Sequence, residues 1–215
     1  MPHDSRPIYI LVNGILSNPG DSDQWTDHGV TWLHQRAGIN AQCEKFEYFA
    51  RALTRRFKQD KHSTELAQLI ASYEGRELHV VTHSNGADLL IRALRKPELA
   101  EIEIESAHLI AAACEEDFST NGLNAALAAE RLGSIYVYAS ENDGVLKYFA
   151  RPSRFLLGWA NLGYGLLGLR GPINVARAIS PAVVTTWKNH HGHSTWFKGE
   201  HFAETFYAIL TNDQK

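Results

Sequence analysis

The sequence has few cysteines, a small net charge and no long apolar run, and each of these shortages argues against a class of protein. Its 215 residues include 2 cysteines, Cys43 and Cys114, too few for a framework of disulfide bonds. The formal net charge is −3 and the lysines and arginines are mostly scattered, so we expect no nucleic-acid partner. The most apolar stretch, residues 155–169, is interrupted by glycines and is too short to span a membrane as a helix.

The rest of the composition is ordinary. Hydrophobic residues make up 44% and charged residues 21%, as in a soluble globular protein, and we predict one domain over residues 1–215. The N-terminal MPHDSRP has no basic segment leading into an apolar one, so we expect no signal peptide, a cytoplasmic location and no stable membrane insertion. The sequence does not indicate an oligomeric state.

Apolar runs typical of strands alternate along the chain with segments of helical period. Strands are predicted at 7–12, 41–48, 78–81, 107–113, 134–139 and 183–187. Helices are predicted at 30–37, 63–73 (with Ser63 as its cap), 121–132 and 201–210, and a further helix follows residue 86 and ends at Pro97. This alternation favours a mainly parallel sheet covered on both faces, which is a three-layer α/β/α sandwich.

The most informative segment is residues 78–94, LHVVTHSNGADLLIRAL. An apolar strand runs into a sharp turn centred on Ser84, and a helical pattern follows at once, which is the layout of a nucleophile elbow. Close packing of that strand and helix needs small residues two before and two after the serine. Gly86 fits this need, and Thr82 fits it less well. A serine after a strand is also a common helix N-cap, so the motif alone leaves both interpretations open.

Polar residues follow two later strands, at the sheet edge where parallel strands of such proteins carry their function. Residues 140–144, SENDG, follow one strand, and the histidine-rich residues 188–194 follow the last. The chain order is therefore serine, acid, histidine. With this order and the elbow, nearly the whole chain resembles a small member of the α/β-hydrolase superfamily. Thr82 departs from the glycine usual there, and the early antiparallel strands of larger members are expected to be absent.

The resemblance implies a catalytic acid after the strand at 134–139, which would be Asp143. Asp-Gly is also a common turn pair, so a plain turn residue is the alternative for Asp143. Asp117, which follows the preceding strand, is the main rival acid, and Glu141 is a weaker one.

The resemblance also implies a catalytic histidine in a Gly-His-Ser-like segment before an aromatic pair, which would be His193. Three nearby histidines are rivals: His190, His191 and His201. His191 and His193 have the spacing to supply two metal ligands, but no cysteine or carboxylate lies at a typical zinc spacing beside them, so we expect no metal. Two histidines within predicted strands are expected to be core residues, His79 and His108.

The backbone of two turns completes the implied site. The resemblance makes the amides of Asn85, directly after the serine, and Ile15, after the first strand, the donors of an oxyanion hole. Gly14 would let the backbone approach a substrate closely. The alternative is a plain Asn-Gly turn that ends the strand.

Together these residues imply a serine hydrolase that acts on a small acyl substrate and needs no cofactor. An apolar segment at 148–175 is either a cover or pocket for the acyl group or a part of the core, and a pocket would favour carboxylic esters. Four residues are expected to line it: Leu16, Trp25, Tyr148 and Phe149. The same chemistry cleaves thioesters and amides. A catalytically silent scaffold that binds a ligand or a protein is the hypothesis of a different class.

Overall fold

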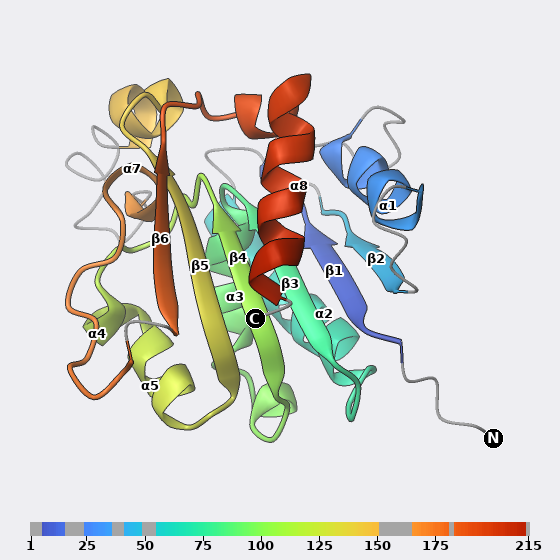
Figure 1. Ribbon diagram of the computed structural model, residues 1–215. Helices are drawn as coiled ribbons and strands as arrows, with labels where there is room; N and C mark the ends of the chain where they lie inside the picture. Colours follow the sequence, from blue (N-terminus) through green and yellow to red (C-terminus); the bar gives the residue numbers. More distant parts are fainter. Residues whose placement is uncertain are drawn as a thin grey trace.

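In the computed structural model of the chain, six parallel strands form one sheet in the order β2-β1-β3-β4-β5-β6. The structure describes residues 6–15, 24–35, 41–48, 55–150, 165–180 and 183–213. Figure 1 shows the sheet with its strands running in one direction and helices on either side. The expected three-layer α/β/α architecture is thus confirmed.

The strands are β1 (Ile8–Val12), β2 (Gln42–Phe46), β3 (Leu78–His83), β4 (Ile104–Ile110), β5 (Leu132–Ser140) and β6 (Val184–Asn189). The longer α-helices are α1 (Trp25–Gln35), α2 (Arg55–Ala71), α3 (Gly86–Ala93) and α8 (Glu200–Asp213). The shorter helical elements are η1 (Pro97–Leu99), α4 (Phe118–Asn121), α5 (Leu123–Ala128), η2 (Leu146–Ala150), α7 (Leu167–Arg170) and η4 (Thr195–Phe197).

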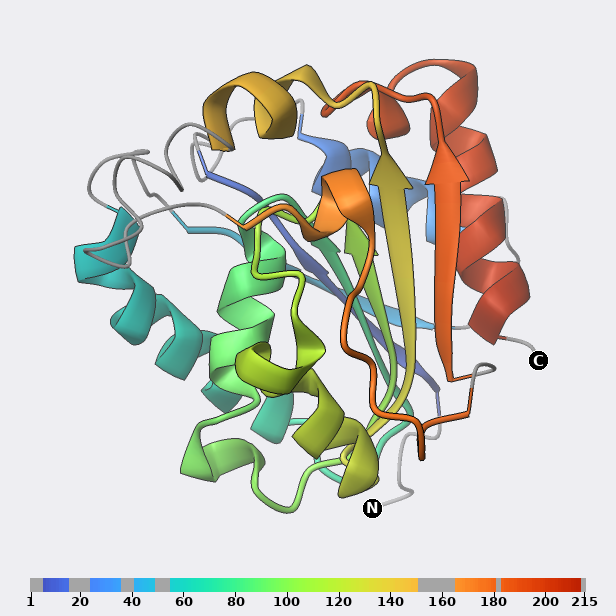
Figure 2. The ribbon, with the colours of Figure 1, turned by 90° about the vertical axis from the view of Figure 1, so that its left-hand side faces the viewer.

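The central strands are apolar without interruption because both faces of the sheet are covered. Every residue of β1 is buried, and alternate side chains enter different cores. Ile8 and Ile10 join the core beneath α2 and α3, whereas Tyr9 and Leu11 join the core beneath α1 and α8. Figures 1 and 2 show α1 and α8 on one face and α2, α3 and α5 on the other.

Several predicted boundaries shift in the structure. The second long helix begins at Arg55, so the prediction that Ser63 caps it is wrong: the Ser63 hydroxyl lies inside the helix and donates to the carbonyl of Asp60. Of the predicted helix at 121–132, only Leu123–Ala128 forms a continuous helix, α5. Gly122, with a left-handed φ of 87°, separates it from α4, and Leu132 already begins β5. The first helix begins at Trp25, five residues before its predicted start at residue 30.

The fourth strand shifts by a few residues from its predicted position. The strand predicted at 107–113 is Ile104–Ile110, and it ends where Ala111 takes a positive φ of 47°. Cys43 and Cys114 are both free thiols. Among the described residues, no helix is long and apolar enough to cross a membrane.

The strand order determines where a site can form. The chain crosses from β1 to β2 on one side and then to β3 on the other, so the carboxyl ends of β1 and β3 lie at the point where the direction of winding reverses. Open parallel sheets bind ligands at this switch point. Gly14 follows β1 and Ser84 follows β3 at that point.

Candidate active site

Ser84 occupies a strained turn between β3 and α3. Its φ is 54°, a left-handed conformation that is rare for a residue with a side chain and is found where function requires it. The neighbouring strand holds the turn in place: the Ser84 amide donates to the carbonyl of Ile110 at 3.0 Å, and the amide of Ala113 donates to the carbonyl of Ser84 at 3.0 Å. The strand, strained serine and helix have the local geometry expected of the elbow.

Gly86 is required by the close approach of β1. A Cβ atom at this position would lie 2.7 Å from the carbonyl oxygen of Asn13 and 2.8 Å from that of Val12. Thr82, on the other side of the turn, fits because its buried hydroxyl donates to the carbonyl of His108 at 3.1 Å. The position where the superfamily usually has glycine therefore accommodates a threonine by a hydrogen bond within the sheet.

Asp143 follows β5 and is fully buried. Its Oδ1 accepts the amide of Leu146 at 2.9 Å, which caps the helical turn that follows. Its Oδ2 lies 2.7 Å from Nδ1 of His193. The carboxylate thus has a different partner for each oxygen, and both partners hold it in one orientation.

His193 connects the other two side chains. Its Nε2 lies 2.9 Å from the Ser84 hydroxyl oxygen. Because the carboxylate of Asp143 only accepts, Nδ1 of His193 carries the proton and Nε2 is left to accept from Ser84. The structure therefore brings the three predicted side chains together in an unbroken chain of hydrogen bonds.

The rival acids and histidines have other surroundings. Asp117 caps α4 by accepting from the Ser119 amide. Hydrogen bonds from the Ser119 hydroxyl and the Asn174 side chain lower its pKa. Glu141 is exposed. His190 is exposed, and His191 and His201 lie against each other beside α8. His79 and His108 are buried and hydrogen-bonded to Ser106, as expected of core residues.

His83 is a residue of the site that the sequence reasoning missed. Its Nε2–H donates to the backbone carbonyl of His193 at 2.9 Å. His83, the residue directly before Ser84, therefore anchors the segment that carries His193. Burial and the charge of His193 lower the pKa of His83 to about 3, which keeps the ring neutral. The alternation of side chains along the strand could have indicated this role. It places His83 on the same face as Val81, which packs in the core beneath α8, so His83 is expected to point inward and to need a hydrogen-bond partner.

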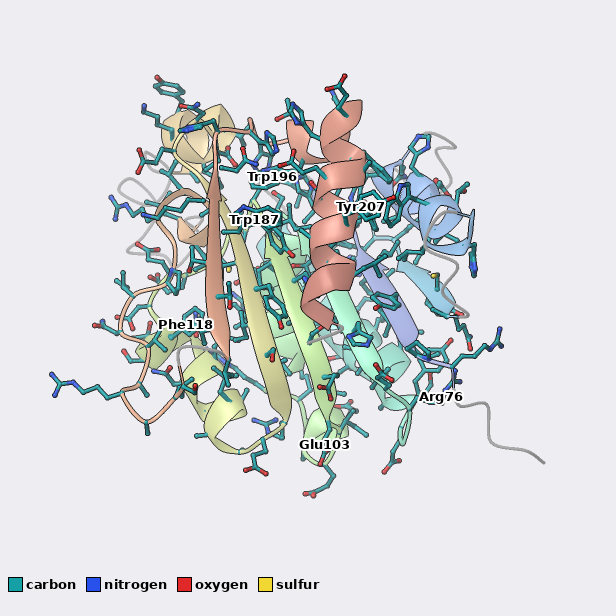
Figure 3. All side chains as sticks on the ribbon, viewed as in Figure 1. Arg76, Glu103, Phe118, Trp187, Trp196 and Tyr207 are labelled. Carbon is teal, nitrogen blue, oxygen red and sulfur yellow. The ribbon has the colours of Figure 1, made fainter. Side chains whose placement is uncertain are left out.

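The segment around His193 is fixed from three further sides. The side chain of Asn142 donates to the carbonyl of His190 at 3.3 Å. Trp196 in η4 is buried, and the Thr205 hydroxyl of α8 donates to its carbonyl at 2.9 Å. Figure 3 shows Trp196 between the end of β6 and α8. These contacts leave the His193 ring little freedom to turn away from Ser84.

The loop after β1 lies directly beside the serine. A Cβ atom on Gly14 would lie 3.0 Å from Cβ of Ser84, so only a glycine allows this approach. Asn85 is the N-cap residue directly before α3, and its side chain donates to the hydroxyl of Tyr48 at 2.9 Å, which fixes the turn after Ser84. Ile15 follows Gly14 in the same loop and is partly buried. The two amides remain predicted oxyanion donors, now with their loops adjacent to Ser84.

No protein-family model and no curated protein matches the sequence. Several solved structures match almost the whole chain, including these three. A YdeN-like hydrolase from Pectobacterium atrosepticum is 13% identical, with 97% of this chain and 91% of that chain covered and a TM-score of 0.51. Est1E from Butyrivibrio proteoclasticus is 10% identical, with 99% and 90% covered and a TM-score of 0.50. The type II thioesterase BorB from the borrelidin biosynthetic cluster is 14% identical, with 98% and 94% covered and a TM-score of 0.50.

The chain therefore has an α/β-hydrolase fold. The fold predicted from the resemblance is confirmed by these structures and by the parallel sheet. In this α/β-hydrolase fold, Ser84, Asp143 and His193 follow β3, β5 and β6 respectively.

The predicted substrate-lining residues have different surroundings. Trp25 stacks on Phe197 with ring centroids 4.2 Å apart and meets the edge of His83 at 6.3 Å. Tyr148, in η2, is 74% exposed. Leu16, the side chain of Phe149 and residues 151–164 of the expected cover lie outside the described part of the chain. The lining role of these residues stays a prediction.

An apolar cavity lies away from the serine, between α8 and the strands β5 and β6. Its volume is about 580 Å³, and its walls include Tyr136, Tyr138, Trp187 and Tyr207. Figure 3 shows Trp187 on β6 and Tyr207 on α8. This cavity is on a face of the sheet, whereas the Ser84 site is at the carboxyl ends of the strands.

Proposed function

We propose that this chain is a serine hydrolase that cleaves carboxylic esters through an acyl-enzyme intermediate. The single observation that carries the proposal is the pair of hydrogen bonds that His193 makes. It accepts one from the Ser84 hydroxyl at 2.9 Å and donates the other to the buried Asp143 at 2.7 Å. A serine on a strained turn, a base within hydrogen-bond reach and a carboxylate that orients the base are the parts that acyl transfer requires.

In the first half of the reaction, the Ser84 oxygen attacks the carbonyl carbon of the ester as its proton passes to Nε2 of His193. Asp143 stabilises the imidazolium that forms and keeps Nδ1 as the hydrogen-bonded nitrogen. When the tetrahedral intermediate collapses, the bond to the alcohol oxygen breaks and His193 returns the proton to that oxygen. The alcohol leaves, and the acyl group remains on Ser84.

In the second half, water repeats these steps. His193 removes a proton from the water as the water oxygen attacks the acyl carbon. The bond to the Ser84 oxygen then breaks, His193 returns the proton to that oxygen, and the carboxylic acid leaves. The negative charge on the carbonyl oxygen develops beside the amides of Ile15 and Asn85 in both halves. Each donor of this kind raises kcat by about 10²–10³. The close approach of the Gly14 loop to Ser84 would bring the Ile15 amide toward the carbonyl oxygen of the substrate.

Esters are the first choice of substrate because aromatic side chains, Trp25 and Phe197, pack around His83, the residue directly before the serine. The same steps cleave thioesters, and one structural neighbour is a type II thioesterase. Amides need the same proton transfers to the leaving group. The substrate class is therefore best measured on matched acyl groups that differ only in the leaving atom.

The test is reaction with a fluorophosphonate probe, followed by hydrolysis of an acyl panel. Wild-type protein should be labelled and Ser84→Ala should not, whereas Ser119→Ala, a serine at the exposed start of α4, should be labelled like wild type. A labelled wild type that cleaves oxygen esters faster than matched thioesters and amides supports the whole proposal. Folded wild-type protein without labelling or hydrolysis would instead identify a scaffold that only binds ligands.

A further inference from the structure

Three side chains that commonly bind metals lie together where the segment after β6 meets α8. Nε2 of His191 is 3.8 Å from Oε2 of Glu204, and Nδ1 of His201 is 3.6 Å from the same oxygen. The two imidazole centroids are 4.0 Å apart, and all three ligand atoms lie within 4.8 Å of one another. The cluster therefore brings two nitrogens and a carboxylate oxygen to one point.

The fold presents these groups from two elements. His201 and Glu204 are three residues apart on α8 and so share a face of the helix. His191 comes from the segment after β6, and its buried ring meets the face of Trp196 edge-on at 4.7 Å. One ligand is thus held rigidly, while the other two are about half exposed and free to adjust.

The separations are close to those of a metal site. Bonds of about 2.0 Å in tetrahedral geometry put zinc ligands about 3.3 Å apart, so the 3.6 Å and 3.8 Å separations need only small side-chain movements. The Asn189 side-chain amide lies 2.8 Å from Nε2 of His191 and donates to it, which makes Nε2 the nitrogen with the lone pair. Burial and the charge of His201 lower the pKa of His191, which favours the neutral ring that a metal needs.

We propose that His191, His201 and Glu204 bind a divalent transition-metal ion of the Zn²⁺ class. Two imidazoles and one carboxylate match the ligands that zinc takes in proteins, and they disfavour Mg²⁺ and Ca²⁺, which prefer oxygen ligands. Three protein ligands leave a tetrahedral ion one position for water. The ion replaces the Asn189 amide as the partner of Nε2 of His191.

The ion would join the segment that carries His193 to α8. His191 is two residues from His193, so a metal bond at His191 restrains the backbone of the proposed base without touching the reacting atoms. This role differs from the proposed hydrolysis, which uses no metal. It also differs from the sequence expectation, which considered His191 with His193 and had no carboxylate to complete the set.

The test is titration of the full metal-free chain with ZnCl₂ by calorimetry, and with CoCl₂ by visible absorption. Wild-type protein should bind one ion with the strong visible bands of a Co²⁺ ion that has few ligands. His201→Ala and Glu204→Gln should each weaken binding at least about tenfold, since even the outer partners of metal ligands are worth about 10–100-fold. Both residues are about half exposed, so the variants should fold.

Two matched controls separate this site from general surface binding by histidine and glutamate. Glu200→Gln removes a carboxylate one turn earlier on α8, and His190→Ala removes the exposed imidazole next to His191. Both should bind Zn²⁺ like wild type. Wild-type protein that binds no ion, or four variants that all bind equally, would overturn the proposal. Fluorophosphonate labelling of Ser84 is measured separately, so failure of the metal site leaves the proposed hydrolase untouched.

Discussion

His191 and His193 lie two residues apart on one segment, and each has a carboxylate beside it. The carboxylate of His193 is Asp143, which is fully buried and hydrogen-bonded at 2.7 Å. The carboxylate of His191 is Glu204, which is 52% exposed and lies 3.8 Å away. Each imidazole thus has a carboxylate as its neighbour, but the carboxylate beside His193 is buried and held in place, whereas the one beside His191 is half exposed.

This difference separates two kinds of chemistry on one short segment. A buried carboxylate with its second oxygen bound to the Leu146 amide cannot move, so it fixes one tautomer and one ring orientation in His193. An exposed carboxylate on a helix surface can rotate toward an ion or toward water. His193 is suited to proton transfer and His191 to ligand binding, although the residue type is the same.

The largest expected effect is at Ser84, whose hydroxyl oxygen lies 2.9 Å from Nε2 of His193. Ser84→Ala should lower kcat by about 10⁴–10⁶ with the fold intact, because the nucleophile and its base act as a unit. The measurement is ester hydrolysis under saturating substrate, with circular dichroism as the control for folding. A variant that keeps most of its activity would remove Ser84 from the mechanism.

The two histidines themselves provide the sharpest contrast. His193→Ala should be as damaging as Ser84→Ala, and the double variant should be little worse than either. His191→Ala loses its packing on Trp196, the hydrogen bond from Asn189 and the link toward α8. None of these contacts involves the reacting atoms, so kcat should fall by less than about tenfold. The comparison fails if His191→Ala is the inactivating change.

The carboxylates are compared by two changes that each remove one negative charge. Asp143→Asn should lower kcat by up to about 10⁴, because the imidazole loses the partner that orients it and stabilises its charge. Asp117→Asn should leave kcat nearly unchanged and reduce only the capping of α4. If Asp117→Asn inactivates instead, the acid follows β4 rather than β5.

His83 offers a smaller effect and a conservative rescue. His83→Leu removes the donor that holds the His193 carbonyl, and a hydrogen bond of this kind is worth up to about tenfold in rate. His83→Gln keeps an N–H at a similar reach and should recover most of the lost kcat. Steady-state kinetics should show the change in kcat rather than in KM, and equal losses in both variants would mean that the ring, not the donor, matters.

The smallest expected effect is on the pH dependence of stability. The pKa of His83 is about 3 in the folded chain, against an ordinary value of 6.5 when the chain unfolds. Between pH 6.5 and about 3 the unfolded chain takes up a proton that the folded chain does not, so the free energy of unfolding falls as the pH falls. His83→Gln removes this contribution, and urea unfolding at about pH 7.5 and about pH 5 should show a weaker pH dependence than wild type. If wild type and His83→Gln lose the same free energy of unfolding between these two pH values, the lowered pKa of His83 is contradicted.

Much of the fold and the Ser84 site could be predicted because the signals are local. The apolar run, the turn and Gly86 follow one another in the sequence, so the elbow could be recognised there. The structure supplies the reason for the glycine, since a Cβ atom at residue 86 would clash with the carbonyl oxygens of Val12 and Asn13. The two interpretations of Asp143 were treated as rivals, yet both describe it: one oxygen caps a turn and the other meets His193. A sequence pattern cannot assign the two oxygens of one carboxylate separately.

The remaining features depend on contacts between distant segments. The start of α2 at Arg55 was missed because Ser63 resembles a cap, although its hydroxyl bonds back within the helix. The pairing of His191 with Glu204 depends on how α8 packs on the sheet, which neither local pattern contains. The same holds for His83, whose partner lies 110 residues away in the chain.

The most direct test of the central claim is to locate the site of covalent reaction. Wild-type protein is treated with a fluorophosphonate, digested, and sequenced by tandem mass spectrometry. We predict a single adduct, on Ser84. It should form at least about 10²-fold more slowly in His193→Ala than in wild type, and at nearly the wild-type rate in His191→Ala. An adduct on another residue, or equal rates in the two histidine variants, would contradict the assignment of Ser84 and His193.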